Sequence, residues 1–243
     1  MKIDVLAFGV HPDDVELGGA GVLIAEKKKG KKIAIVDLTQ GELGTRGDAE
    51  TRKTEATAAA EILNVDAREN LMMEDGFFEN NETNKRKIIT VLRKYKPEII
   101  FCNAPEDRHP DHGRSALLVE EAAFLSGLSK IETFLDNELQ TAWRPKFVFN
   151  FIQDRYLKPD FVIDVSEEME QKIDSVKAYK TQFFNIDNQG GPQTYISSPE
   201  FLESVYARAA MFGKMIGVKY AEGFLSKKMI GFKNLDALVK ETT

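Results

Sequence analysis

The stretch "VLAFGVHPDDVELGGAG" at residues 5–21 decides the fold that we predict for this chain. It continues a largely apolar run that begins at residue 3, ends at residue 10 and is typical of a strand buried on both faces. The run stops abruptly at His11-Pro12-Asp13-Asp14, after which a pair of glycines and a helical pattern follow. A strand that passes through a short turn into a helix indicates the first unit of an α/β sheet. The ionisable side chains at the strand end need a separate explanation.

The same alternation of strand and helix patterns continues along the chain. Apolar runs of strand length lie at residues 3–10, 32–38, 97–103, 146–152 and 160–165, with a weaker run at 68–73. Segments with helical spacing or composition lie at residues 49–64, 84–96, 113–127, 169–184 and 198–217. Buried strands that alternate with helices indicate a parallel sheet covered on both faces. We therefore predict an α/β fold, in which residues 1–243 form a single domain with one Rossmann-like, doubly wound, mostly parallel sheet.

Composition excludes several classes of protein. The 243 residues carry a formal net charge of -6 and no dominant basic stretch, which argues against a nucleic-acid partner. The single cysteine, Cys102, excludes an intrachain disulfide, is typical of a reducing compartment, and is predicted to be a core residue. We find no apolar segment long enough for a membrane span and no signal-peptide pattern, so we predict a soluble, cytoplasmic protein without a membrane partner.

All three histidines of the chain lie in two related motifs, His11-Pro12-Asp13-Asp14 and His109-Pro110-Asp111-His112, which we call the first tetrad and the second tetrad. Each tetrad lies at or just beyond the end of a predicted strand and just before a helix. In doubly wound sheets the first strand commonly lies beside the strand that opens the second half, and ligands bind at that switch point. If strands 3–10 and 97–103 are these neighbours, the two tetrads meet in one crevice.

The residue types of the tetrads indicate metal-dependent hydrolysis. Imidazole and carboxylate groups together suit a divalent transition metal, and hydrolytic zinc sites typically use three protein ligands and a water. Such a metal lowers the pKa of water to about 7 and polarises a carbonyl. The tetrads hold more groups than a metal needs, so a spare carboxylate can accept a proton and a spare histidine can protonate an amine or stabilise an oxyanion. This combination predicts amide hydrolysis.

Three other interpretations of the tetrads are possible. Asp13 can cap a helix while Pro12 fixes a turn, but this role does not explain why the histidine motif occurs twice. A dinucleotide-binding oxidoreductase needs G-x-G-x-x-G at the first turn, where this chain has polar side chains instead. Spacing alone does not reject a non-catalytic protein that binds a metal or a sugar, and this alternative stays open.

At these residues the chain resembles the GPI de-N-acetylase-like (PIG-L/LmbE-type) family of zinc-dependent sugar deacetylases. The family hallmark His-Pro-Asp-Asp-x-Glu is present at residues 11–16, and a later His-Pro-Asp-His is present as the second tetrad. Further segments resemble one branch, the N-acetylglucosaminyl-malate deacetylases of bacillithiol biosynthesis; they lie at 37–47, 51–56, 75–78, 107–113, 142–146 and 217–224. The resemblance therefore extends through most of the chain.

The resemblance implies roles for the residues of the tetrads. His11, Asp14 and His112 match the ligands of Zn²⁺, although other divalent transition metals also suit them. Asp13 matches the general base. His109 matches an unliganded histidine that stabilises charge or donates a proton.

Two further roles are those of orienting His109 and of stabilising the oxyanion. Asp111 is a candidate for orienting His109. Relatives in the mycothiol pathway carry a tyrosine two residues before the second tetrad, whereas this chain has Asp107 there. An oxyanion role for a tyrosine then falls to another residue, and our candidate is Tyr195. The sequence does not decide between His109 and Tyr195.

Arginines are the candidates for substrate binding. A malyl aglycone carries two carboxylates, and the arginine fork suits a carboxylate. Arg52, Arg108 and Arg144 are our candidates, with pairing to surface acids as the alternative. The resemblance implies hydrolysis of N-acetyl-glucosaminyl L-malate to glucosaminyl-malate and acetate, and this is the reaction that we predict. The alternatives are deacetylation of a chito-oligosaccharide or another N-acetylglucosamine derivative, and a non-catalytic sugar receptor. The resemblance also implies a homo-oligomer, specifically a hexamer.

Overall fold

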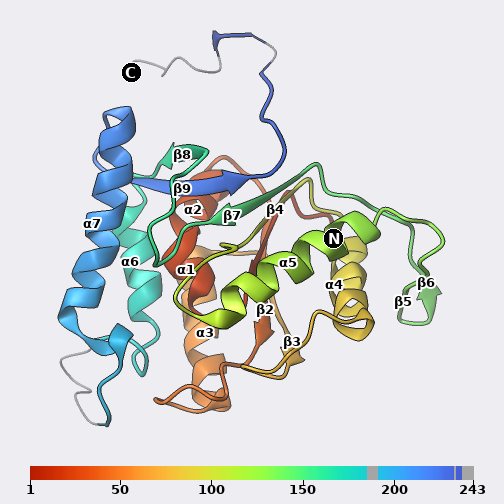
Figure 1. Cartoon of the computed structure of the whole chain (residues 1–243), viewed down its shortest axis with the longest axis horizontal. Coiled ribbons are helices and arrows are strands. Elements are labelled where there is room, and N and C mark those ends of the chain that lie inside the picture. Colours follow the sequence, from red (N-terminus) through yellow and green to blue (C-terminus); the bar gives the residue numbers. More distant parts are fainter. Residues whose placement is uncertain (185–190, 233, 237–243) are drawn as a thin grey trace.

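Strands and helices alternate along the chain as predicted, and they form a central sheet with helices on both faces (Figure 1). The computed structural model describes residues 1–184, 191–232 and 234–236. The central sheet has seven strands in the order β3-β2-β1-β4-β7-β9-β8. Their bounds are β1 Val5–Gly9, β2 Ile33–Thr39, β3 Ala67–Met73, β4 Ile99–Asn103, β7 Phe147–Phe151, β8 Phe161–Asp164 and β9 Ala221–Ser226.

The helices occupy the connections between these strands. Their bounds are α1 Asp14–Gly18, α2 Ala20–Lys28, α3 Ala49–Leu63, α4 Glu82–Tyr95, α5 Pro110–Leu125, α6 Met169–Lys177 and α7 Pro199–Ile216. A short 3-10 helix, η1, covers Tyr195–Ser197, and a separate hairpin is formed by β5 Phe134–Leu135 and β6 Glu138–Leu139. In the described part of the chain no helix is both long and apolar enough to cross a bilayer.

The order of the strands places a switch point between β1 and β4. Strand β1 pairs in parallel with β2 on one side and with β4 on the other, so that Val5 lies opposite both Ile33 and Ile99. This confirms the prediction that the two strands preceding the tetrads are neighbours. Their carboxyl ends therefore open at the same edge of the sheet, where ligands bind in doubly wound folds.

Alternating side chains of the central strands enter two different cores. In β1, Leu6 and Phe8 belong to the core under α4 and α5, whereas Val5 and Ala7 belong to the core under α2. Cys102 of β4 is fully buried in the first of these cores, which confirms its predicted role as a small hydrophobe. Burial also raises the pKa of its thiol. Strand β1 is therefore buried and apolar along its whole length, and the ionisable residues of the first tetrad follow its carboxyl end.

Strand β9 was not predicted. It lies between β7 and β8 and is antiparallel to both, so the sheet is mixed at this edge. Its apolar pattern is interrupted by Glu222 and Gly223, which hides the strand in the sequence. Glu222 is nevertheless buried, because it accepts hydrogen bonds from the backbone N–H groups of Gly21 and Val22 at 2.9 and 2.8 Å and is paired with Lys172.

Two helix boundaries also differ from the prediction. Helix α5 begins at Pro110 rather than at residue 113, and His109 is its N-cap, so the second tetrad forms the cap and first turn of this helix. Proline is well suited to the first helical position because it has no N–H to satisfy there. Helix α6 ends at Lys177, well before the predicted end at residue 184.

Candidate metal centre

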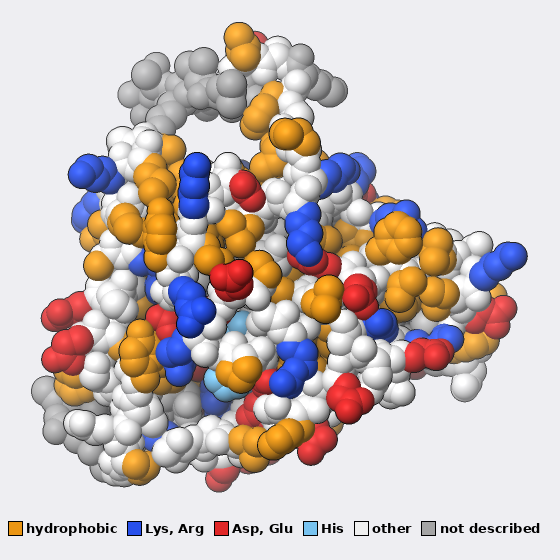
Figure 2. All heavy atoms as spheres, in the orientation of Figure 1, with side chains coloured by type: hydrophobic (Ala, Val, Ile, Leu, Met, Phe, Trp, Pro, Cys, Tyr) orange, Lys and Arg blue, Asp and Glu red, His pale blue; other side chains and the backbone are white. Residues whose placement is uncertain are grey.

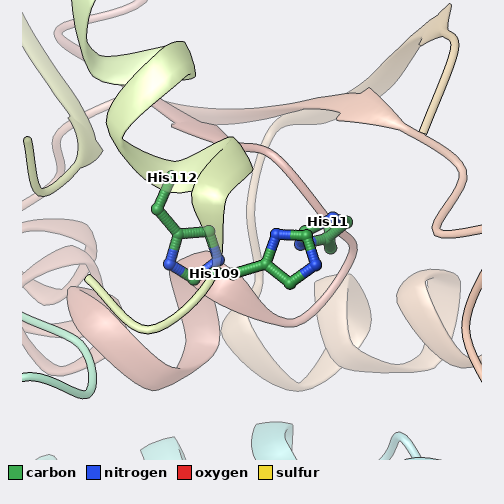
Figure 3. Close-up of side chains that lie close together, drawn as sticks. All are labelled: His11, His109 and His112. Carbon is green, nitrogen blue, oxygen red and sulfur yellow. The ribbon is translucent and has the colours of Figure 1, made fainter. Parts of the chain in front are cut away.

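The structure brings the two tetrads together at the carboxyl ends of β1 and β4. The ring centroids of His11 and His109 are 4.7 Å apart, and His112 lies 5.7 Å from His11 and 5.6 Å from His109. Figure 3 shows the three rings close together, with His109 and His112 carried by the start of α5. In the space-filling view, histidine atoms are visible on this face of the molecule, with basic and acidic side chains around them (Figure 2).

Carboxylates orient two of the three rings. The Nε2 atom of His11 lies 3.0 Å from Asp75 Oδ1, and its Nδ1 atom lies 3.6 Å from Asp14 Oδ2. The His112 ring also lies between two carboxylates, but its two nitrogens have the opposite roles. Its Nδ1 atom lies 2.8 Å from Asp107 Oδ2, and its Nε2 atom lies 3.3 Å from Asp14 Oδ1. Metal-binding histidines commonly bond an outer carboxylate through one nitrogen and leave the other for the metal. Both rings direct their second nitrogen toward Asp14.

Asp14 is held between these rings as an ionised carboxylate. It accepts hydrogen bonds from the His11 backbone N–H at 2.9 Å, from Asn103 Nδ2 at 3.0 Å and from Gln153 Nε2 at 2.7 Å. Burial acts to raise the pKa of Asp14, but the charge of His112 and the hydrogen bonds of both histidines hold this pKa well below its ordinary value. Asp14 thus offers negatively charged oxygen atoms as metal ligands, beside two imidazole nitrogens.

Asp13 has a different environment from its neighbour. Burial raises its pKa to about 7, and the positive charge of Arg52 opposes this increase. Arg52 Nη2 lies 2.8 Å from Asp13 Oδ2. A carboxylate whose pKa lies near neutral pH is suited to accept and return a proton.

The surroundings of His109 favour its neutral form and indicate one tautomer. Its Nδ1 accepts a hydrogen bond from the Asp111 backbone N–H at 3.3 Å, so we assign the ring proton of the neutral form to Nε2. Burial and the charges of His11 and His112 lower its pKa. Asp111 thus contacts this ring through its backbone N–H, while its carboxylate accepts from Arg114 Nη1 at 2.8 Å and from the Gly76 N–H at 2.9 Å.

A cavity of about 300 Å³ opens at the tetrads, and both aspartates of the first tetrad line it together with the three histidines. A larger cavity of about 680 Å³ lies behind Pro12, against α3 and β3, and it is not lined by a histidine. The smaller cavity is the candidate active site because it contains the ionisable groups that hydrolysis requires.

The candidate substrate-binding residues occupy different places. Arg52 and Arg108 line the histidine cavity, whereas Arg144 lines a separate cavity and donates to the Phe124 carbonyl at 2.8 Å. Tyr195 of η1 also lines the histidine cavity, with its hydroxyl 3.0 Å from Asp154 Oδ1. Arg108 Nε donates to the other oxygen of Asp154 at 2.9 Å, and the Arg108 guanidinium lies 4.6 Å from the centre of the Tyr195 ring.

Several residues of the site were not assigned from the sequence. Asn103 is the last residue of β4, Gln153 lies two residues after β7, and Asp75 lies two residues after β3. The sequence did carry a signal for these three residues, because each is a polar residue at the carboxyl end of a parallel strand. Asp107 was noted only as a departure from relatives, and the structure gives it the hydrogen bond to His112.

The donor set fits a divalent transition metal. Ligand atoms of His11, His109 and His112 lie within 4.8 Å of one another, and those of His11, Asp75 and Asp111 form a second such group. Imidazole nitrogen and carboxylate oxygen are ligands that zinc and related metals accept in hydrolytic sites. The geometry thus supports a metal at His11, while more than one ligand set is available to complete the site.

Comparisons with known proteins identify the family. The sequence profile of the PIG-L family, described as GlcNAc-PI de-N-acetylase, matches residues 6–123, which include both tetrads. The uncharacterized deacetylase YaiS of Escherichia coli is 30% identical over 167 residues, covering 63% of this chain and 83% of that protein. The chain belongs to the PIG-L family. This confirms the resemblance drawn from the tetrads, and this PIG-L protein is a hydrolytic N-deacetylase.

Two further relatives of this PIG-L protein have more specific names. The diacetylchitobiose deacetylase of Thermococcus kodakarensis is 29% identical over 231 residues, covering 90% of this chain and 81% of that protein. The probable N-acetyl-alpha-D-glucosaminyl L-malate deacetylase 2 of Bacillus subtilis is 27% identical over 199 residues, covering 75% of this chain and 84% of that protein. The names of both relatives concern N-acetylglucosamine derivatives.

Solved structures confirm the fold of this PIG-L protein. The conserved protein TT1542 from Thermus thermophilus superposes with a TM-score of 0.83 at 32% identity, covering 95% of this chain and 97% of that one. The 4-carboxy-2-hydroxymuconate hydratase GalB from Pseudomonas putida reaches a TM-score of 0.77 at 19% identity, covering 97% and 100%. Since a hydratase shares the fold, the fold alone does not fix the reaction.

Proposed function

We propose that this chain hydrolyses the acetamide of N-acetyl-glucosaminyl L-malate, releasing acetate and glucosaminyl-malate. The observation that carries this proposal is the meeting of the two tetrads in one cavity, with the Asp13 carboxylate beside two carboxylate-oriented histidines. The family assignment supports deacetylation of an N-acetylglucosamine derivative. The name of the Bacillus subtilis relative supports the malate conjugate in particular.

We assign the metal to His11, Asp14 and His112. Each histidine has one nitrogen bonded to an outer carboxylate and the other directed at Asp14, an arrangement that His109 lacks. A divalent ion such as Zn²⁺ at these ligands supplies positive charge that acidifies water and polarises the acetamide carbonyl. The buried, ionised Asp14 offsets part of that charge within the protein.

Asp13 acts as the general base and then as the general acid. In the ionised form it accepts a proton from the attacking water, and in the protonated form it returns this proton to the leaving amine. Both roles suit a carboxyl group whose pKa burial raises to about 7.

His109 stabilises the acetamide oxygen as negative charge develops there. Its neutral ring carries the proton on Nε2 because Nδ1 accepts the Asp111 N–H. A preorganised donor of this kind contributes about 10²- to 10³-fold to the rate of acyl transfer. The Tyr195 hydroxyl is instead hydrogen-bonded to Asp154, so we assign the oxyanion role to His109 rather than to Tyr195.

Arg108 is our candidate for the aglycone carboxylates. Arg52 is buried against Asp13, and Arg144 lines another cavity, whereas Arg108 is half-exposed where it lines the histidine cavity. A carboxylate of the substrate can exchange with Asp154 at this guanidinium. We therefore expect Arg108→Ala to raise KM for the malate conjugate and to leave KM for plain N-acetylglucosamine unchanged.

A second candidate substrate is diacetylchitobiose. The match to the Thermococcus kodakarensis enzyme covers 90% of this chain, more than the 75% covered by the malate deacetylase. Kinetic measurements with the malate conjugate, diacetylchitobiose and N-acetylglucosamine decide between them, because the proposed function requires the highest kcat/KM for the malate conjugate. Higher kcat/KM for diacetylchitobiose would keep the chemistry and reject the aglycone, while binding without turnover would indicate a receptor.

A further inference from the structure

We propose that Arg52 is a positioning residue that fixes the turn carrying Asp13 and aims the Asp13 carboxylate, rather than a ligand of the substrate. This inference rests on the proposed function of Asp13 as the base. It replaces the substrate-binding role that the sequence favoured for Arg52, and three features of the structure support it.

The first feature is the backbone of Asp13. Its φ is 129° and its ψ is -22°, a conformation that residues with a side chain rarely adopt. Asp13 stands at the N-cap position of α1, yet its side chain makes no capping hydrogen bond. The Asp13 side chain therefore does not hold the turn by capping α1, and beside the local bond from the His11 N–H to Asp14 Oδ2 a further contact is needed to keep the backbone of Asp13 in place.

The second feature is the contact made by Arg52. One terminal nitrogen, Nη2, donates to the Pro12 carbonyl at 2.8 Å and to Asp13 Oδ2 at 2.8 Å. The same nitrogen thus fixes the peptide that precedes the strained residue and the side chain of that residue. Arg52 is only 5% exposed, so this nitrogen makes its bonds away from bulk water.

The third feature is the loop that encloses the guanidinium. Gly41 has φ +65°, and a Cβ atom placed on it would lie 2.6 Å from Arg52 Nη1. A Cβ atom on Gly44 would lie 3.1 Å from the same nitrogen. The glycines after β2 therefore leave space that the Arg52 side chain fills. A guanidinium enclosed in this way is better suited to a fixed structural contact than to movement toward a ligand.

Steady-state kinetics separate positioning from substrate binding. In Arg52→Ala we expect kcat to fall about 100-fold, the loss typical of a misplaced reacting group, while KM stays within about threefold and bound metal is unchanged. Added guanidinium ion should restore part of kcat in this variant. Lys53→Ala, an exposed neighbour on α3, is the matched control and should behave as wild type. A raised KM with an unchanged kcat would overturn the proposal and make Arg52 a substrate ligand.

A second pair of variants tests the contact without removing Arg52. Gly41→Ala should lower kcat because the new methyl group displaces the guanidinium. Gly30→Ala also places a side chain at positive φ, here +83°, but no atom of the described residues lies within 4 Å of the added carbon, so kcat should be unchanged. Equal kcat in the two variants would contradict the proposal.

A crystal structure of Arg52→Ala gives a readout that does not depend on turnover. We expect Asp13 to relax to negative φ in this variant and to keep positive φ in Lys53→Ala. If wild-type protein deacetylates no N-acetylglucosamine derivative, the proposed function fails, yet this structural comparison still decides what Arg52 does. Positive φ at Asp13 without the Arg52 side chain would show that Arg52 does not hold the turn.

Discussion

The two tetrads have nearly the same sequence but different backbones. The first tetrad forms a turn in which Asp13 has φ 129° and makes no capping bond. The second tetrad forms a regular helix start, with His109 as the N-cap at φ -86°, Pro110 in the first turn and Asp111 beside it. The tetrads differ at their fourth residue, where Asp14 accepts a local hydrogen bond from the His11 N–H at 2.9 Å and His112 has no carboxylate to do so, and the first turn also receives the tertiary contacts of Arg52.

The consequence is clearest at the third position of each tetrad. The Asp13 carboxylate lines the cavity, and burial raises its pKa to about 7, which suits proton transfer. The Asp111 carboxylate is held by Arg114 and the Gly76 N–H, and its pKa is lowered against burial by the nearby His11 and by the Gly76 N–H. In the proposed function Asp13 is therefore the reactive aspartate, and Asp111 supports the site.

The largest expected effect is a loss of bound metal that should occur on replacing His11 but not on replacing His109, the first residues of the two tetrads. His11→Ala should lose both bound metal and activity, because a ligand is removed. His109→Ala should keep the metal and lose about 10²- to 10³-fold in kcat, because a donor to the oxyanion is removed. Metal analysis of the purified variants checks this. Loss of metal from His109→Ala would favour the three-histidine ligand set instead.

The third positions should also differ. Asp13→Asn should lower kcat by about 10²- to 10⁴-fold with bound metal retained, since the general base is lost. Asp111→Asn removes an outer carboxylate 3.7 Å from His11 Nε2, so we expect about 10- to 100-fold weaker metal binding instead. Metal titration beside single-turnover kinetics distinguishes these results. A similar loss of kcat in both variants when they are saturated with metal would mean that the two aspartates share one role.

The pH profile provides a smaller test of the same contrast. Below a pH of about 7, Asp13 is protonated and cannot accept a proton from water, so kcat should fall about tenfold for each further pH unit. Asp111 has a lowered pKa and stays ionised there, so Asp111→Asn saturated with metal should keep this acidic limb. A wild-type profile that is flat between pH 5 and 8 would argue against Asp13 as the base.

The smallest expected effect is on the free energy of unfolding. The difference in stability between a glycine and an alanine variant should have opposite signs at Asp13 and at Asp111. Asp13→Gly should be more stable to unfolding than Asp13→Ala by about 1–3 kcal/mol, because glycine tolerates the positive φ. Asp111→Gly should be less stable than Asp111→Ala by up to about 1 kcal/mol, because glycine disfavours a helix. Urea denaturation of the four variants measures both differences. The same sign at both positions would show that the first turn carries no strain.

Much of the fold was predictable because its signals are local. The apolar runs of β1, β2, β4 and β7 are nearly continuous, and they correctly indicated buried parallel strands. Strand β9 escaped because Glu222 and Gly223 break its pattern, and only the buried partners of Glu222 explain how that residue is accommodated. A strand whose acid is satisfied by distant residues has no clear local signature.

The candidate site was predictable in part for the same reason. The tetrads carry histidine and aspartate in a repeated local motif, and their meeting followed from a predicted order of strands. The partners that tune them come from separate strand ends, as with Asp75 and Gln153. The contact between Arg52 and Asp13 joins residues 39 positions apart, so no local pattern shows it. The predicted hexamer stays a prediction.

The most direct test of a single metal-dependent deacetylase site built from both tetrads is acetate release from N-acetyl-glucosaminyl L-malate. The assay compares metal-loaded wild-type protein, the same protein after chelation and re-addition of Zn²⁺, and Asp13→Asn loaded with metal. We predict turnover by the loaded protein, loss of turnover on chelation with recovery on re-addition, and turnover reduced at least about 100-fold in Asp13→Asn. Acetate release that survives chelation, or full activity in Asp13→Asn, would contradict this assignment of the site.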